Sequence, residues 1–215
     1  MLRAYLDDSG SDNSTILAIG GGISWPAAWD DFGRELTRFL SHHGLQTLHM
    51  SELGWNEETS GPIVRGAFAL VDRYVECYVG CSVGRADPYL KRYHDAGLAC
   101  VRAVIRLAKR WPNERVEIVF EQTKGLTGTV VDTIKNSLDQ KGWEHVADIR
   151  METKREIVLG AADVIVSTYR VVAETDPKEI DCLPRLKKWA VEQLRKKPCQ
   201  ILFAPGGAED TLNYG

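Results

Sequence analysis

The sequence lacks the features that mark several large classes of protein. Its five cysteines are an odd number without a Cys-x-x-Cys pair, which fits neither a disulfide framework nor a zinc knuckle. No apolar run reaches the roughly 18 residues that a membrane span requires. The start of the chain also lacks the charged and apolar regions of a signal peptide. We therefore expect a cytoplasmic protein with free thiols and no membrane partner.

An excess of positive charge is also missing. The chain has 27 Lys and Arg against 30 Asp and Glu, a net charge of -3, so it has no global basic field for coating nucleic acid. This balance still fits a nuclease, which needs an acidic site for metal and only a local basic rim. The hydrophobic fraction of 44% over 215 residues is enough for one large domain, or for one domain with an appendage.

Apolar periodicity predicts an α/β fold. The clearest signal is the alternation from Val75 to Val83, which is typical of a half-buried strand and puts Cys77 and Cys81 on its apolar face as packing residues. Further strands are expected at Leu2–Leu6, Thr15–Ile23, Val116–Glu121 and Val146–Met151. Helices are expected from Pro26 to Gly44, up to about Tyr74, and at Pro88–Trp111, Thr129–Lys141, Ile157–Ala173 and Asp181–Lys197.

This order of elements predicts a mixed sheet flanked by helices. Residues 1–175 are expected to form the main domain, with a helical insertion at about 26–74 after the second strand. Within that insertion, residues 45–61 are interpreted as a functional loop or a short element. Residues 176–215 are expected to form an appendage with an extra basic helix. Its tail from Pro205 to Gly215 is expected to be mobile or partner-dependent.

Two acidic residues lie at the ends of predicted strands. Asp7 ends the first strand and Glu121 ends the strand that begins at Val116, and sites in α/β proteins gather at such strand ends. The structural alternatives are a turn at Asp7, since Asp favours turns, and a solvated strand end at Glu121. Asp8 follows Asp7 directly, so the two side chains should point to opposite faces of the sheet.

Asp163 lies in a predicted helix that is almost wholly apolar around it. An ionised carboxylate in such a place is costly unless it is paired or bound to a metal. The small residues that precede it would let the helix lie close to the sheet and bring Asp163 near the strand ends. The structural alternative is an ion pair with Lys154, Arg155 or Arg170.

A fourth candidate is the pair His49 and Glu52, which would share one face if the segment is helical. A surface loop is the alternative. Together with Asp7, Glu121 and Asp163, these residues supply hard oxygen ligands that suit Mg²⁺ or Mn²⁺. Two such ions can clamp the attacking and leaving oxygens of a phosphodiester. Ligation rich in Cys or His, which would favour zinc, is absent from the sequence pattern.

The same motifs resemble a known family. The segment Tyr5-Leu6-Asp7-Asp8-Ser9-Gly10 resembles the Tyr-Ile-Asp-Glu-Ser-Gly opening of the bacterial domain of unknown function 3800 family, which is assigned to the RNase H-like superfamily. The segment from Leu48 to Leu53 is similar to its His-x-x-Glu motif. The segment from Gly160 to Ile165 is similar to its closing Ala-Asp helix, and Glu121 falls where the family carries a strand acid.

The resemblance spans about residues 2 to 175 and implies an RNase H-like fold with a metal-dependent nuclease site. It does not imply a particular substrate. Three positions depart from the family pattern: Asp8 stands where Glu is usual, Gly160 where a Gln often stands, and Glu121 where Asp is more usual. These departures favour, as an alternative, a module that keeps the fold and has lost the chemistry.

Local basic surfaces offer contacts for nucleic acid. The last predicted helix is the most basic, and the helix from Lys91 to Arg110 is also basic and could line a groove. For the last helix the alternative is a solvated amphipathic helix that packs its apolar residues inward. The positive residues of that helix are Arg185, Lys187, Lys188, Arg195, Lys196 and Lys197.

The leading hypothesis is a metal-dependent phosphodiesterase that cleaves DNA or RNA. Asp7, Glu121 and Asp163 would bind Mg²⁺ or Mn²⁺, with Glu52 or Asp8 as a fourth ligand. His49 or Lys154 would assist by proton transfer or charge neutralisation. The alternative is a catalytically inactive interaction or nucleic-acid-binding module. Hydrolysis of a phosphorylated small molecule and assembly into a homo-oligomer both stay open.

Overall fold

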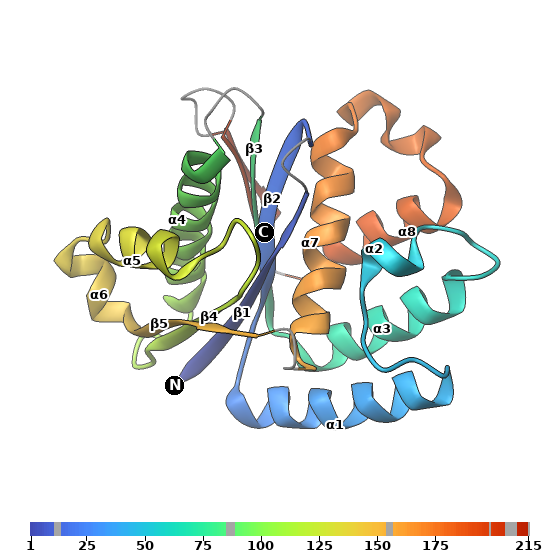
Figure 1. The fold of residues 1–215 in the computed structure, drawn as a ribbon, viewed down its shortest axis with the longest axis horizontal. Coiled ribbons are helices and arrows are strands. Elements are labelled where there is room, and N and C mark those ends of the chain that lie inside the picture. The colour runs from blue at the N-terminus through green and yellow to red at the C-terminus, as the bar shows by residue number, and fades with distance from the viewer. Residues whose placement is uncertain (11–13, 85–88, 154–156, 198, 205–209, 215) are drawn as a thin grey trace.

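The structure is a computed structural model that describes residues 1–10, 14–84, 89–153, 157–197, 199–204 and 210–214. Across these ranges, seven strands form one sheet in the order β5-β4-β1-β2-β3-β6-β7 (Figure 1). The strands are β1 (Leu2–Ser9), β2 (Ile16–Ser24), β3 (Cys77–Gly84), β4 (Val116–Glu121), β5 (Val146–Glu152), β6 (Cys199–Ala204) and β7 (Asp210–Tyr214).

The sheet is mixed, as the order of elements predicts. β1, β2 and β3 form an antiparallel meander, while β4 pairs in parallel with β1 and β5 pairs in parallel with β4. β6 is parallel to β3, and β7 returns antiparallel to β6. β1 is therefore interior, and its end meets the end of β4 at the same edge of the sheet.

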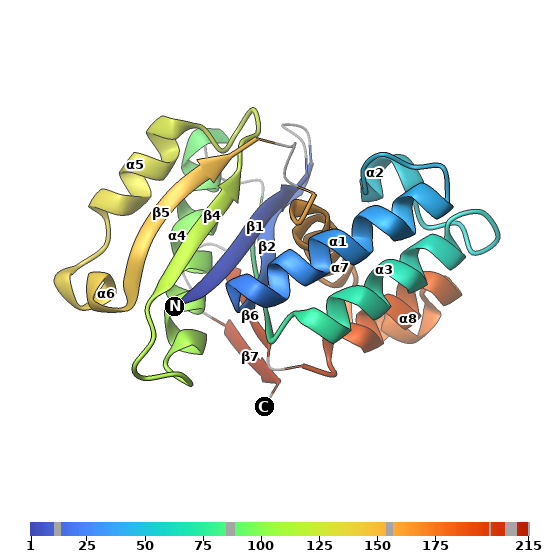
Figure 2. The same cartoon turned by 90° about the horizontal axis from the view of Figure 1, so that it is seen from below.

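Helices cover both faces of the sheet (Figures 1 and 2). One face carries α4 (Tyr89–Ala108), α5 (Gly128–Asn136) and α6 (Gln140–His145). The other carries α7 (Leu159–Glu174), α8 (Arg185–Leu194) and the three helices of the predicted insertion, α1 (Pro26–His42), α2 (Met50–Leu53) and α3 (Gly61–Tyr74). Each face has its own apolar core, because successive residues of a strand point to opposite sides.

The close approach of α7 to the sheet depends on a glycine in β3. The ring of Tyr169 lies directly on Gly80, where a Cβ atom would be 2.4 Å from Cδ2 of Tyr169. That separation is shorter than a carbon–carbon contact, so any larger residue would force the ring away. Tyr169 is buried on the same helix as Asp163, and the small residues before Asp163 are buried as well. The predicted close packing of this helix is confirmed.

Two predicted helices differ in the structure. The region predicted as one helix from Thr129 to Lys141 is broken into α5 and α6, because the Asp139 side chain accepts a hydrogen bond from the backbone N–H of Gly142 and starts a new helix. The predicted helix from Asp181 is a 3-10 turn at Pro177–Cys182 followed by α8. Pro184 separates them, since a residue before proline disfavours helical geometry.

The C-terminal segment departs furthest from expectation. β6 and β7 extend the sheet beyond β3, whereas the sequence predicted no strand there. The expectation of a mobile or partner-dependent tail is wrong for residues 210–214, which form β7. Positions 205–209 and 215 of the predicted tail lie outside the described residues.

Cysteine placement follows the sequence prediction. Cys77 and Cys81 are buried in β3, and Cys77, Cys100 and Cys182 are free thiols. Burial raises the pKa of the Cys77 thiol to about 11, so this sulfur is an inert packing group. No helix in the described ranges is long and apolar enough to cross a membrane.

Candidate functional site

Asp7 and Glu121 occupy equivalent places on neighbouring parallel strands. Leu6 on β1 is in register with Phe120 on β4, so the next residues on the two strands are Asp7 and Glu121. Both acids point to the α7 face, because Leu6 and Phe120 belong to the core on the other face. Asp7 is 6% exposed and Glu121 2% exposed. The sequence therefore places two buried carboxylates side by side at one sheet edge.

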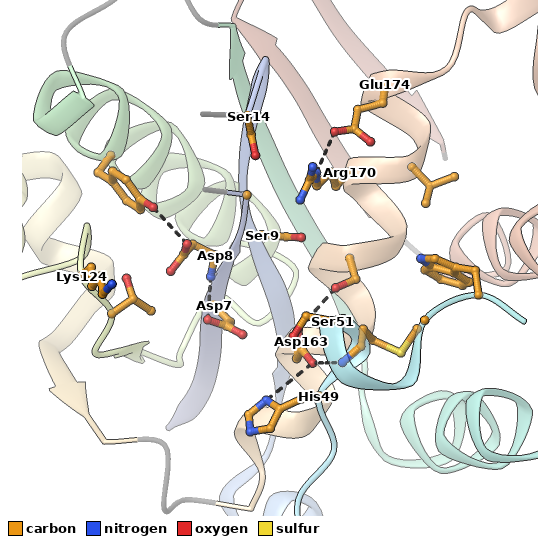
Figure 3. Close-up of a pocket in the computed structure, with 18 of the residues that line it drawn as sticks. Asp7, Asp8, Ser9, Ser14, His49, Ser51, Lys124, Asp163, Arg170 and Glu174 are labelled. Atoms are coloured by element: carbon orange, nitrogen blue, oxygen red, sulfur yellow. Dashed lines mark hydrogen bonds and ion pairs between the residues drawn. The ribbon is translucent and has the colours of Figure 1, made fainter. Parts of the chain in front are cut away.

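Asp163 joins them from α7, and its hydrogen-bond partners also attach α2. Its Oδ2 atom accepts a hydrogen bond of 2.6 Å from the backbone N–H of Met50, the first residue of α2. Its Oδ1 atom accepts one of 3.3 Å from the Ser167 hydroxyl. His49, which precedes α2, has Nδ1 at 4.0 Å from Oδ2 (Figure 3). Asp163 thus caps a short helix from outside, which explains how an acid is tolerated in an apolar helix.

The structural ion pair that the sequence offered for Asp163 is not formed with Arg170. That guanidinium pairs with Glu174 at 2.7 Å on its own helix. The other two predicted partners, at positions 154 and 155, lie outside the described residues, as does the assisting role expected for Lys154.

Asp8 points away from the three acids. Its Oδ2 atom accepts a hydrogen bond of 3.1 Å from the hydroxyl of Tyr93 on α4, the helix on the opposite face (Figure 3). Its backbone N–H donates to Oδ1 of Asp7 at 2.7 Å. The predicted divergence of Asp7 and Asp8 is therefore present, and Asp8 acts on Asp7 through its backbone. Tyr93 was missed by sequence reasoning, because the pattern near Asp8 contains no signal for a residue 85 positions away.

Burial and mutual repulsion set the electrostatics of the site. Burial, followed by the charges of Glu121, Asp163 and Asp8, raises the pKa of Asp7 well above its usual value, while the Asp8 backbone hydrogen bond opposes this rise. Burial raises the pKa of Asp163 to about 6, although the Met50 hydrogen bond and His49 act in the opposite direction. For Asp7 and Asp163 the site therefore favours the protonated carboxyl, and a bound cation would favour the ionised form instead.

Glu52 is not brought to this cluster. It is exposed on α2 and is not among the residues that line the cavity above the acids. His49 does line the cavity, so the structure separates the two members of the predicted His-x-x-Glu pair. At the sheet edge a different acid stands beside Glu121: Glu152 on β5, which is in register with it and pairs with Arg150. Its place directly after a predicted strand was the signal for finding it.

An open cavity of about 1230 Å³ lies over Asp7 and Asp163, and Glu121 is not part of its lining. Figure 3 shows Asp163 and His49 on one side of Asp7 and Lys124 on the other. Sequence reasoning missed most of the lining, because those residues come from loops and helix ends that carry no motif. The lining includes Ser9, Ser14, Ser51, Trp55, Thr123, Lys124, Arg170 and Lys187.

The donors of the cluster fit a divalent cation by their chemistry. Carboxylate oxygens on rigid elements are the ligands that Mg²⁺ and Mn²⁺ prefer, and a cation would relieve the repulsion that raises the pKa of Asp7. As the side chains stand in the described ranges, no group of three or more His, Cys, Asp or Glu residues is placed so that it could hold a metal ion.

The last helix, α8, is largely an amphipathic helix that packs its apolar residues inward, which was the alternative to a nucleic-acid-binding surface. Leu186, Ala190 and Leu194 of α8 are buried against the core. Lys188 pairs with Asp181 at 2.8 Å, and Lys197 donates to the backbone carbonyl of Val75 at 2.6 Å. Among the described basic residues of this segment, Lys187 alone lines the cavity.

The sequence was compared with protein-family models and with curated proteins, and it matches none of them significantly.

Proposed function

We propose that this chain is a metal-dependent phosphodiesterase that cleaves a nucleic-acid backbone. One observation carries the proposal: Asp7 on β1 and Asp163 on α7 line one open cavity of about 1230 Å³, and Glu121 lies beside Asp7 at the end of the neighbouring parallel strand. No arginine or lysine is hydrogen-bonded to Asp7 or Asp163 among the described residues. Burial and the neighbouring acids disfavour an ionised Asp7, and a bound cation would offset that cost.

The sheet supports an RNase H-like assignment. An antiparallel meander of three strands is extended at β1 by two parallel strands, and helices cover both faces. This is the mixed, helix-flanked sheet that the resemblance implies, with the first-strand acid at its interior. The helical insertion between β2 and β3 also lies where that interpretation requires it.

Each group in the site has a proposed role. Asp7, Glu121 and Asp163 would hold Mg²⁺ or Mn²⁺, which would activate water and neutralise charge at the phosphate. His49 lies beside Asp163 and would accept the proton that the attacking water loses. Lys124 lines the opposite side and neutralises phosphate charge, a role that sequence analysis assigned to Lys154. Asp8 orients Asp7 through its backbone N–H, so its shorter side chain is compatible with activity.

The test is a cleavage screen with single-stranded, duplex and hybrid substrates in Mg²⁺ and in Mn²⁺. We expect metal-dependent cleavage that Asp163→Asn abolishes, and Mn²⁺ binding by calorimetry that Asp7→Asn abolishes. Asn keeps the size of the side chain and an oxygen for the Met50 N–H, so folding should survive. Equal Mn²⁺ binding by wild type and Asp7→Asn would refute the assignment.

A second candidate is a nucleic-acid-binding module without chemistry. The observation that favours it is the structural use of Asp163, whose two oxygens already accept hydrogen bonds from Met50 and Ser167. The same screen separates the two functions, because a module would bind substrate without cleaving it in either metal.

A further inference from the structure

The cavity extends well beyond the acids. Its lining runs from the end of β1 and the loop after β4 to the C-terminal turns of α7 and to Lys187 on α8. Its volume of about 1230 Å³ is larger than the roughly 300–1,000 Å³ of a typical small-molecule site. A ligand that fills it must be long enough to touch both the acids and α8.

Two lysines stand at separate parts of this lining without a carboxylate partner. Within the described residues, no Asp or Glu forms an ion pair with Lys124 or Lys187. Other cations nearby are neutralised: Arg170 by Glu174 at 2.7 Å and Lys188 by Asp181 at 2.8 Å. Lys124 and Lys187 are therefore available to an anionic ligand, and they come from different elements, the loop after β4 and α8.

An aromatic side chain lines the same cavity. Trp55 is partly buried and follows Gly54, which ends α2 with φ of 66°. This left-handed conformation is strained for other residues, so glycine is required for the turn that brings Trp55 to the cavity. The turn belongs to the segment that Asp163 holds through the Met50 N–H. A tryptophan and two lysines that line one cavity are the combination that binds successive bases and phosphates of a single strand.

The burial of the acids favours a single-stranded ligand over a duplex. Asp7, which is 6% exposed, lies at the floor of the cavity, and α2 and the loop after β4 stand on either side of it. The backbone of a stacked duplex is held on the outside of a wide, stiff rod. A single strand can turn its backbone down to the floor while a base stacks on a wall.

We propose that this cavity binds a single-stranded nucleic-acid segment, with a base stacked on Trp55 and phosphates contacted by Lys124 and Lys187. The inference rests on the proposed function, because it takes the acidic cluster as the place where the scissile phosphate lies. It adds the substrate class, which the acidic cluster alone leaves open.

The experiment measures binding separately from cleavage. Full-length Asp7→Asn is titrated into fluorescein-labelled single strands of about 12 nucleotides, of DNA and of RNA, and into the matching duplexes, with anisotropy as the readout. This background prevents cleavage during the titration. We expect single strands to bind at least about tenfold more tightly than duplexes. Equal binding, tighter duplex binding or no binding would overturn the proposal.

Three substitutions in the same background assign the contacts. Trp55→Ala should weaken single-strand binding about tenfold, while Trp55→Phe, which keeps a stacking face, should restore most of it. Lys124→Ala and Lys187→Ala should each lower the slope of log K against log salt by about 0.7, the value for one lost phosphate contact. Lys196→Ala removes the same charge from an exposed position just after α8 and should leave the slope unchanged.

The outcomes separate this inference from the proposed function. Metal-dependent cleavage by wild type together with preferred duplex binding would support the phosphodiesterase function and overturn the proposed single-strand binding. The opposite outcome is single-strand binding that depends on Trp55, Lys124 and Lys187, without cleavage in any metal. It would support the proposed single-strand binding and refute the phosphodiesterase function. Slopes that are unchanged in both lysine variants would overturn the proposed phosphate contacts.

Discussion

One face of the strand pair β1 and β4 carries acids at both ends. The surroundings lower the pKa of the acid at the starting end and raise the pKa of Asp7 at the far end. At the starting end Glu117 on β4 is in register with Arg3 on β1. Four residues further along the same strands, Glu121 stands beside Asp7. The strands, the face and the type of side chain are shared, so any difference comes from the neighbours.

At the starting end the acid is neutralised. Burial acts to raise the pKa of Glu117, but hydrogen bonds from Arg150 and Arg3 outweigh it and hold that pKa below its usual value. The Arg150 Nε–H donates to Oε1 of Glu117 at 2.7 Å. At the far end, burial and neighbouring acids raise the pKa of Asp7. A buried strand acid is therefore structural where arginines pair with it. It is available for chemistry where its neighbours are other acids.

The largest expected difference is in catalysis. Glu121→Gln should reduce metal-dependent cleavage by about 10³-fold or more, since it removes a cation ligand and its charge. Glu117→Gln should change the rate by less than about threefold, although it should cost on the order of 1 kcal/mol of stability by leaving two arginines without their carboxylate. Initial rates and urea denaturation on both purified variants provide the check. Similar rate losses in the two variants would remove the distinction between the ends.

A smaller effect is expected on stability in the presence of a cation. At pH 8 in EDTA, Asp7→Asn should be more stable than wild type by on the order of 1–2 kcal/mol, because the substitution removes repulsion from Glu121 and Asp163. With Mn²⁺ at about 100 times its Kd, wild type should gain about 2.7 kcal/mol and Asp7→Asn nothing. Thermal unfolding with and without Mn²⁺ measures both. A destabilised Asp7→Asn in EDTA would show that Asp7 is a structural acid.

The smallest expected effect is on the pH dependence of stability, to which Asp163 and Glu117 contribute with opposite signs. The pKa of Asp163 is raised from 3.8 to about 6, so its contribution to stability is present below pH 3.8 and is lost as the pH rises through about 6. The pKa of Glu117 is lowered from 4.5, so its contribution is present above pH 4.5 and is lost as the pH falls below it.

Metal-free wild type should accordingly lose on the order of 2 kcal/mol between pH 5 and pH 8, and Asp163→Asn should lose clearly less. Urea denaturation in EDTA at the two pH values measures the change. Glu117→Gln is the matched control and should keep the wild-type decline over this range. An identical decline in Asp163→Asn would assign the effect to another group.

Much of the fold was predictable because its signals are local. The alternation that begins at Val75 predicts β3, although the strand is buried on both faces and the expectation of a half-buried strand is wrong. The apolar sequence around Asp163 identifies both a helix and a costly carboxylate. The period of two in a strand was enough to separate Asp7 from Asp8. The mixed sheet flanked by helices followed from the order of the elements.

The remaining features depend on contacts between distant segments. Tyr93 reaches Asp8 from α4, and Met50 reaches Asp163 over 113 positions of sequence. β6 pairs with β3, which lies far away in the sequence, and β7 pairs with β6. The sequence of these two strands has only a weak strand pattern of its own. The neutralisation of Glu117 likewise requires the register of β1, β4 and β5, which a single sequence does not reveal.

The glycine under Tyr169 has a consequence for how the site can change. Asp163 is less than two turns from Tyr169 on α7, and that ring rests on Gly80 of β3. Because Gly80 has no Cβ atom, α7 can lie this close to the sheet. The same contact therefore sets the distance from Asp163 to Asp7. Evolution or design can thus alter the spacing of these carboxylates at position 80, which is not one of the three acids.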